Sequence, residues 1–232
     1  MMDLKQIRRN LESLRERISA AAERSGRAPE AVQLVAVTKT VGIEEARILY
    51  ELGVRDLGEN RVQEAQRKMA ALADLDIAWH MIGHLQTNKA KKVAGNFALI
   101  HSVDSLRLAR ALNAAGERLG AATEVLIQIN VSGEESKSGF APDDLAEALD
   151  AIGEMQSLRV SGLMTMAPFV DDSEEVRPVF SGLRELRDRL KNNVPSNIEL
   201  RRLSMGMTQD FEVAIEEGAD IVRIGTALFR QD

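Results

Sequence analysis

The sequence predicts an α/β fold, a single (β/α)₈ TIM-type barrel with an extra N-terminal helix. Eight short apolar runs, rich in β-branched residues, recur along the 232 residues, and nearly all are followed by a helical pattern. No Pro- or Gly-rich linker breaks this alternation, so we expect residues 1–232 to form one domain. The number of strands and the length, a little under the typical ~250 residues, both favour a barrel.

The first element is an amphipathic helix over residues 4–24. Its apolar side chains recur every three or four positions among charged ones, at Leu4, Ile7, Leu11, Leu14 and Ile18. A turn sequence, Ser-Gly-Arg-Ala-Pro, follows at 25–29. Because almost no helix follows the last strand, we expect this N-terminal helix to cover that side of the barrel.

The remaining elements alternate in a regular order. Strands are predicted at 32–37, 54–57, 77–82, 99–103, 125–131, 160–164, 199–203 and 221–224. Helices are predicted at 42–52, 61–73, 89–93, 105–119, 142–155, 173–191 and 207–217. An open doubly wound sheet is the alternative, but it usually has fewer strands. The first strand–helix turn, at 37–42, also lacks the GxGxxG spacing of dinucleotide-binding folds.

Composition and charge exclude several classes of protein. The 30 Lys and Arg against 36 Asp and Glu give a net charge of −6, which argues against a protein that mainly grips nucleic acid. The absence of Cys removes disulfides, thiolate nucleophiles and Cys-based metal sites. No apolar run approaches the roughly 20 residues of a membrane span, and the start is charged rather than leader-like. We therefore expect a cytoplasmic protein without a membrane partner.

Polar and small residues gather where the predicted strands end, which in a barrel is where the chemistry lies. They are Lys39, Glu59, Asn60, Gly83, His84, Asp104, Asn130, Ser132, Met164, Thr165, Ser204, Met205, Gly206, Gly225 and Thr226. Strand ends are commonly polar, which explains about half of this set. A lysine that points into a barrel mouth is partly desolvated, which frees its amine as a Schiff-base nucleophile. A lysine snorkelling at the rim is the alternative for Lys39.

Two glycine-containing turns follow the seventh and eighth strands, where barrels often bind phosphate. Ser204–Gly206 and Gly225-Thr226 combine hydroxyl groups with glycines, which allow backbone N–H groups to approach an anion. Ordinary glycine turns are the alternative for each. Together with a lysine on the first strand, they indicate a bound phosphate ester that carries an aldehyde.

His80 and His84 have the spacing of a helical zinc pair, but they belong to a predicted strand. Four residues of strand span roughly 13 Å, too far for both rings to bind one metal ion. We therefore predict no metal site, a structural role for His80 and a position at the site rim for His84. The basic cluster at 88–92 is interpreted as a solvated helix face and not as a nucleic-acid site.

Several long stretches resemble the pyridoxal phosphate homeostasis protein family, whose members look like a stand-alone alanine racemase N-terminal barrel domain. The matching stretches are VAVTK at 35–39, GENRVQE at 58–64, WHMIGHLQTNK at 79–89, IHSVDS at 100–105, QINVSGEESKSG at 128–139, SMGM at 204–207 and IVRIGT at 221–226. They extend from the first strand to the last, so the resemblance covers the whole chain. It departs from the family at Thr38, at the absence of Pro after the lysine, and at Phe140.

The resemblance implies a cofactor, pyridoxal 5′-phosphate, and a role for each residue around it. Lys39 would form the Schiff base, Arg223 would face the pyridine nitrogen, and Asn60 and Met164 would lie near the cofactor. Ser204, Gly225 and Thr226 would hold the phosphate, with Met205 and Gly206 shaping the cradle. No catalytic residue is predicted.

Arg223 by itself does not decide whether the protein is an enzyme. A guanidinium donates to the ring nitrogen and keeps it unprotonated, which makes the ring a poorer electron sink. The racemases that the domain resembles also use arginine there, together with a tyrosine from an added β-domain. Tyr50, the only tyrosine in this sequence, is predicted on the helix after the first strand, away from the mouth.

The leading hypothesis is therefore a non-catalytic protein that holds pyridoxal phosphate on Lys39 and delivers it to apo-enzymes that need this cofactor. A weak racemase-like enzyme is the second hypothesis, and a barrel that binds another phosphate ester is the third. The racemase arrangement that needs a dimer uses the domain not found here, so a monomer is expected.

Overall fold

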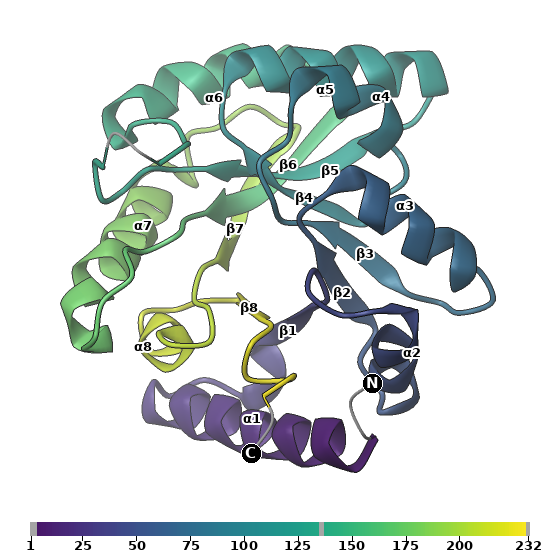
Figure 1. Cartoon of the computed structure of the whole chain (residues 1–232). Helices are drawn as coiled ribbons and strands as arrows, with labels where there is room; N and C mark the ends of the chain where they lie inside the picture. Colours follow the sequence, from purple (N-terminus) through teal and green to yellow (C-terminus); the bar gives the residue numbers. More distant parts are fainter. Residues whose placement is uncertain (1–3, 135–136, 231–232) are drawn as a thin grey trace.

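The computed structural model, which describes residues 4–134 and 137–230, is a closed eight-stranded parallel barrel (Figure 1). Neighbouring strands pair in chain order, and β8 closes the barrel on β1. The strands are β1 (Gln33–Val37), β2 (Asp56–Glu59), β3 (Ala78–Met81), β4 (Leu99–Val103), β5 (Thr123–Gln128), β6 (Leu158–Met164), β7 (Ile198–Ser204) and β8 (Ile221–Ile224). The predicted TIM-type barrel is confirmed. Glu135 and Ser136, which belong to one of the matching stretches, lie outside the described residues.

Helices surround the barrel on its outer face. They are α1 (Leu4–Arg24), α2 (Ile43–Glu51), α3 (Val62–Ala71), α4 (Ala90–Val93), α5 (Leu106–Leu119), α6 (Leu145–Gly153), α7 (Arg177–Leu190) and α8 (Phe211–Glu216). Short 3₁₀ turns at Pro29–Ala31, Thr87–Lys89, Pro142–Asp144 and Ser173–Val176 precede β1, α4, α6 and α7. Within the described ranges, no helix has the length and apolarity needed to cross a membrane.

The N-terminal helix takes the place of the helix missing after β8, as the sequence predicted. In Figure 1, α1 lies alongside α8 and below β8 and β1. Its buried face includes Ile7, Leu11 and Leu14. The side chain of Asn10 donates to the carbonyl oxygens of Leu228 and Arg230, each at 3.0 Å, which joins this helix to the segment after β8.

β2 and β5 differ most from their predicted positions, and β6 begins at Leu158 rather than at 160. β2 begins at Asp56 rather than at 54, because the N–H of Val54 bonds to the carbonyl of Leu49 at the end of α2. β5 ends at Gln128 rather than at 131, because Ile129 leaves the ladder to pair with Phe140 in the following loop.

The hydrophobic core has two parts. The larger part lies between the strands and the helices. The smaller part fills the inside of the barrel with five buried side chains, Val35, Leu99, Leu126, Met164 and Ile221. Inward-facing residues alternate with outward-facing ones along each strand, so the polar residues that share the barrel interior are the unusual ones.

Candidate functional site

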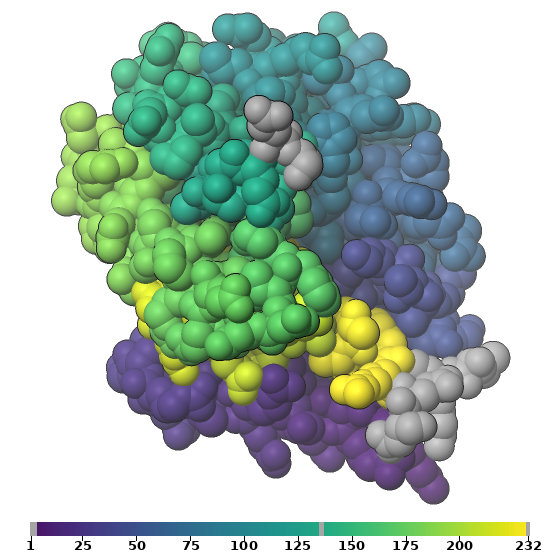
Figure 2. Space-filling view, turned by 60° about the vertical axis from the view of Figure 1, so that its left-hand side comes forward, coloured from purple at the N-terminus to yellow at the C-terminus, as the bar shows by residue number. Residues whose placement is uncertain are grey.

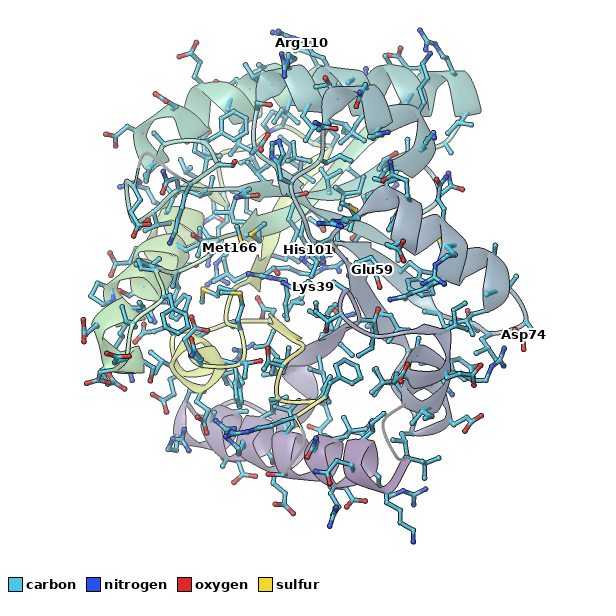
Figure 3. The ribbon with its side chains drawn as sticks, in the orientation of Figure 1. Lys39, Glu59, Asp74, His101, Arg110 and Met166 are labelled. Carbon is cyan, nitrogen blue, oxygen red and sulfur yellow. The ribbon has the colours of Figure 1, made fainter. Side chains whose placement is uncertain are left out.

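Lys39 lies on the turn directly after β1, at the mouth formed by the carboxyl ends of the strands. Its side chain is exposed, and no described residue pairs with its amine. Figure 3 shows Lys39 over the centre of the barrel, whereas Asp74 and Arg110 lie on the perimeter. The sequence predicted partial desolvation of this amine. The structure corrects that expectation, because the turn carries Lys39 beyond the packed end of the strand.

A buried ion pair supports the backbone just before Lys39. The amine of Lys68, on α3, donates to the carbonyl oxygen of Thr38 and to Oε1 of Glu59, both at 2.6 Å. The Thr38 hydroxyl donates to the same carboxylate oxygen, also at 2.6 Å. Lys68 and Glu59 are both almost completely buried. The peptide that leads into Lys39 is therefore held from behind by three charge-assisted or buried hydrogen bonds.

The loops after β7 and β8 form one continuous surface beside Lys39. The N–H of Arg223 donates to the carbonyl of Gly206 at 3.0 Å, and the N–H of Met205 donates to that of Ile221 at 3.1 Å. The N–H of Ala227 reaches the hydroxyl of Thr208 at 3.4 Å. These bonds bring together the two turns that the sequence separated by about twenty residues.

Glycine is required at both turns of this surface. Gly206 has φ +93°, and a Cβ there would lie 2.7 Å from the Cβ of Ala214 on α8. A Cβ on Gly225 would lie 3.1 Å from the carbonyl oxygen of Val37 on β1. The two glycines therefore let the loops approach α8 and β1 closely.

Asp210 closes the loop after β7. Its carboxylate accepts the N–H of Met207 at 2.6 Å and is nearly buried. Burial raises the pKa of this carboxyl group, while the bond from Met207 and the charge of Arg223 act in the opposite direction.

Arg223 and Ser204 lie inside the barrel, just below this surface. The guanidinium is 4% exposed and donates to the Ser204 hydroxyl at 2.5 Å and to the carbonyl oxygen of Thr165 at 2.9 Å. Burial lowers the pKa of Arg223 to about 10, so it stays charged at neutral pH. The resemblance implied that Ser204 holds phosphate, and that role stays a prediction. Its hydroxyl is fully buried between Arg223 and His101, so its side chain also supports the arginine.

The other expected site residues contribute in different ways. Thr226 is exposed and Asn60 half-buried at the mouth, and no described residue is bonded to either side chain. Met164 is fully buried in the barrel interior. Met205 is also fully buried but packs on the outer side, between strands and helices. Their roles toward a cofactor stay predictions.

The two histidines considered as a zinc pair, His80 and His84, lie in different environments. His84 lies after β3 with a side chain 62% exposed, and its Nδ1 is 2.9 Å from a carboxylate oxygen of Asp104, after β4. His80 is buried inside the barrel and bonded to His101 and Asp56. Across residues 4–134 and 137–230, no three His, Asp or Glu side chains are grouped as metal ligands.

A hollow of about 630 Å³ adjoins the cradle on the side of α1. Its walls include Thr208 and Asp210 after β7, Thr226 after β8, and Asn10 and Arg17 on α1. In Figure 2, the yellow C-terminal segment lies between the green segment after β6 and the purple α1. The hollow therefore lies between α1 and the loops that follow β6, β7 and β8.

Sequence reasoning gave no role to two buried residues of this site, Lys68 and His101. In the sequence, Lys68 looks like any other charged residue of an amphipathic helix. It can be buried because Glu59, at the end of β2, lies beside it. His101 stands in a strand whose other residues are mostly apolar, and an isolated polar residue in such a run was the available signal.

The comparisons with known proteins agree across the whole chain. Residues 2–231 match the family model "Alanine racemase, N-terminal domain". A pyridoxal phosphate homeostasis protein of Aquifex aeolicus is 49% identical over 214 residues, which are 92% of this chain and 93% of the relative. The structure of PipY from Synechococcus elongatus with PLP bound has a TM-score of 0.84 and 37% identity, covering 97% of this chain and 100% of PipY.

A more distant structure shares the fold alone. The alanine racemase of Clostridium difficile is 17% identical, with a TM-score of 0.74. The match covers 98% of this chain but only 57% of the racemase.

Proposed function

Because the chain belongs to the family of pyridoxal phosphate homeostasis proteins, we propose that it binds pyridoxal 5′-phosphate at the barrel mouth and holds it without catalytic turnover. The single observation that carries this proposal is the amine of Lys39, which is exposed on the turn after β1 and has no partner among the described residues. When bound, this cofactor supplies an aldehyde that a primary amine can attack with loss of water, and a phosphate group.

The residues present fit each part of that group. Lys39 is the nucleophile, and the turn held by Lys68 orients it. The half-buried backbone at Gly225 suits an anion, because this residue has no side chain to shield its N–H, and buried Gly206 shapes the neighbouring turn. Arg223 is a buried donor that keeps its proton, so a ring nitrogen beside it would stay unprotonated.

The position of the only tyrosine supports the proposed absence of catalytic turnover. Tyr50, the only tyrosine in the sequence, lies on α2 with its ring stacked 3.8 Å from the guanidinium of Arg55. It is held on the outside of the barrel. The open mouth and the exposed Lys39 suit a protein that takes up the cofactor and passes it to apo-enzymes.

Lys39→Arg tests the binding proposal, since a guanidinium keeps the charge but does not condense with an aldehyde. Addition of pyridoxal phosphate should give the wild type a visible absorbance band. Borohydride reduction should then fix the cofactor, less its aldehyde oxygen lost as water, to the peptide that contains Lys39. Both signals should disappear in Lys39→Arg and persist in Lys91→Arg, which alters an exposed lysine on α4. A band that survives in Lys39→Arg would contradict the assignment.

A weak racemase-like activity is the second candidate, and the His84–Asp104 pair at the rim favours it, because such a pair can move a proton. Exchange of the α-hydrogen of amino acids for solvent deuterium distinguishes the two candidates. Exchange that depends on both Lys39 and His84 would establish the enzyme, and its absence across a panel of amino acids supports the binding protein.

A further inference from the structure

A chain of hydrogen bonds runs through the barrel interior from Arg223 to Asp56. Arg223 donates to Oγ of Ser204 at 2.5 Å, and that oxygen is 2.8 Å from Nδ1 of His101. Nε2 of His101 is 2.9 Å from Nδ1 of His80, whose Nε2 is 3.0 Å from Oδ1 of Asp56. Ser204, His101 and His80 are almost completely buried, whereas Asp56, the first residue of β2, is partly exposed at the opposite end of the barrel.

The direction of the chain follows from the chemistry of its two ends. Arg223 can only donate, so the Ser204 oxygen accepts from it. Since His101 is the only other described partner of that oxygen, the hydroxyl hydrogen must go to Nδ1 of His101. The opposite tautomer of His101 would leave this buried hydrogen without an acceptor, which is costly.

The same reasoning fixes the next two bonds. With Nδ1 of His101 accepting, its Nε2 carries the hydrogen and donates to Nδ1 of His80. Nε2 of His80 then donates to the carboxylate of Asp56, which also accepts from the side-chain amide of Gln33 at 2.8 Å. Every bond from the guanidinium to the carboxylate therefore points the same way.

This one-way order matters because Arg223 is a buried cation without a carboxylate in contact. Its direct partners among the described residues are neutral, the hydroxyl of Ser204 and the carbonyl of Thr165. Hydrogen bonds in series polarise one another, so the negative charge of Asp56 strengthens each acceptor up to the Ser204 oxygen. Burial, followed by the positive charge of Arg223, lowers the pKa of His101 well below its ordinary value, which keeps the link neutral.

We propose that His101 is a positioning residue for Arg223, and that it acts as the central link of a relay from Arg223 through Ser204 and His80 to Asp56. The relay holds the guanidinium through its Nη1, while Nη2 donates to the carbonyl oxygen of Thr165. The consequence for a bound ligand rests on the proposed function, in which Arg223 contacts the cofactor ring. The order of the hydrogen bonds does not depend on it.

Imidazole nitrogen NMR on the protein without added cofactor tests the relay directly. The sequence contains three histidines, so the three rings can be assigned by single substitutions, and exposed His84 is the internal reference. Both buried rings should be neutral, with the hydrogen on Nε2 and none on Nδ1. A hydrogen on Nδ1 of His101, or a doubly protonated His80 at neutral pH, would overturn the relay.

Asp56→Asn tests whether the charge of Asp56, at the far end of the chain of hydrogen bonds, affects the ring of His101. This variant keeps an oxygen acceptor at a partly exposed position but removes the charge, so it should fold. The Nε2 signal of His101 should shift although residue 56 does not contact that ring, and the signal of His84 should not move. Unchanged His101 signals would contradict coupling along the chain.

Two substitutions at His101 distinguish a residue that only accepts from Ser204 from one that also links Ser204 to His80. His101→Asn keeps an acceptor near the position of Nδ1 but breaks the link to His80, whereas His101→Leu removes both. Each should weaken pyridoxal phosphate binding by about tenfold, as expected for a weakened charge-assisted hydrogen bond, and shift the absorbance band. Full recovery in His101→Asn would show that Ser204 needs only an acceptor, and would overturn the relay.

The two proposals fail in distinguishable ways. A wild type that gives no Lys39-dependent band defeats the proposed function, while the tautomers of His80 and His101 still decide the relay. If His101→Leu does not fold, His101→Asn and Asp56→Asn carry the test.

Discussion

At the scale of single residues, the position of Lys39 depends on a second lysine, Lys68, which lies behind the strands. Lys68 neutralises Glu59 behind the strands and holds the carbonyl that precedes Lys39. The second oxygen of Glu59, Oε2, is buried and unpaired among the described residues. The carboxylate is therefore already poorly solvated, and it depends strongly on the one cation beside it.

Replacing Lys68 by Met should destabilise the protein strongly, because it leaves the carboxylate of Glu59 buried without a counter-charge. We expect a loss of about 3–5 kcal/mol in the free energy of unfolding, measured with urea. Lys191→Met, which breaks the exposed pair with Asp188, is the matched control and should cost less than about 1 kcal/mol. Equal losses in the two variants would contradict the role given to Lys68.

At the scale of elements, the cradle depends on how closely the loop after β7 approaches α8. Gly206 permits this approach, since its positive φ and the 2.7 Å separation from the Cβ of Ala214 both exclude a side chain. The loop cannot move outward without breaking the bond from the N–H of Arg223 to the carbonyl of Gly206. The glycine thus links the shape of the cradle to the backbone of β8.

Gly206→Ala should therefore lower the free energy of unfolding by more than the backbone conformation alone requires. A left-handed conformation costs an alanine about 1–2 kcal/mol, and overpacking adds about 1–3 kcal/mol. Gly26→Ala is the control, because Gly26 also has positive φ (+70°) but nothing lies within 4 Å of the added Cβ. Urea unfolding should show the larger loss in Gly206→Ala, together with weaker cofactor binding. Similar losses in both variants would argue against close packing as the cause.

At the scale of the whole molecule, the barrel encloses titratable groups that ordinary barrel interiors lack. His101 is completely buried, and its pKa is lowered first by burial and then by the positive charges of Arg223 and Arg202. The folded protein therefore resists protonation of this ring, whereas the unfolded chain accepts a proton below about pH 6.5.

The stability of the protein should fall as the pH decreases from about 7 toward 5. The unfolded state binds the extra proton in this range, so each such proton removes up to about 1.4 kcal/mol per pH unit, and the stability is fully present above the unfolded pKa. Urea unfolding at several pH values should give a flatter profile for His101→Leu than for the wild type. His84→Gln, at the exposed ring, should leave the slope unchanged, and parallel profiles for wild type and His101→Leu would contradict the prediction.

The sequence by itself determined the barrel, the order of its elements and the position of Lys39 at the end of the first strand. Period-two and period-3.6 patterns are local, and parallel strands separated by helices have few ways to pack, so these features follow from short stretches of chain. The boundaries of β2 and β5 were less predictable, because single pairings such as that of Ile129 with Phe140 ended or displaced them.

Only the tertiary structure decided which polar residues share the barrel interior. The side chain of Ser204 lies between Arg223 and His101, because its strand turns that side chain inward. Asp56, His80, His101 and Arg223 come from four strands, and their order along one hydrogen-bonded chain depends on barrel closure and register. Spacing along the sequence carries no information about which inward-facing residues meet across a closed barrel. The residues of the mouth could therefore be predicted from the ends of the strands, whereas the hydrogen-bonded chain inside the barrel could not.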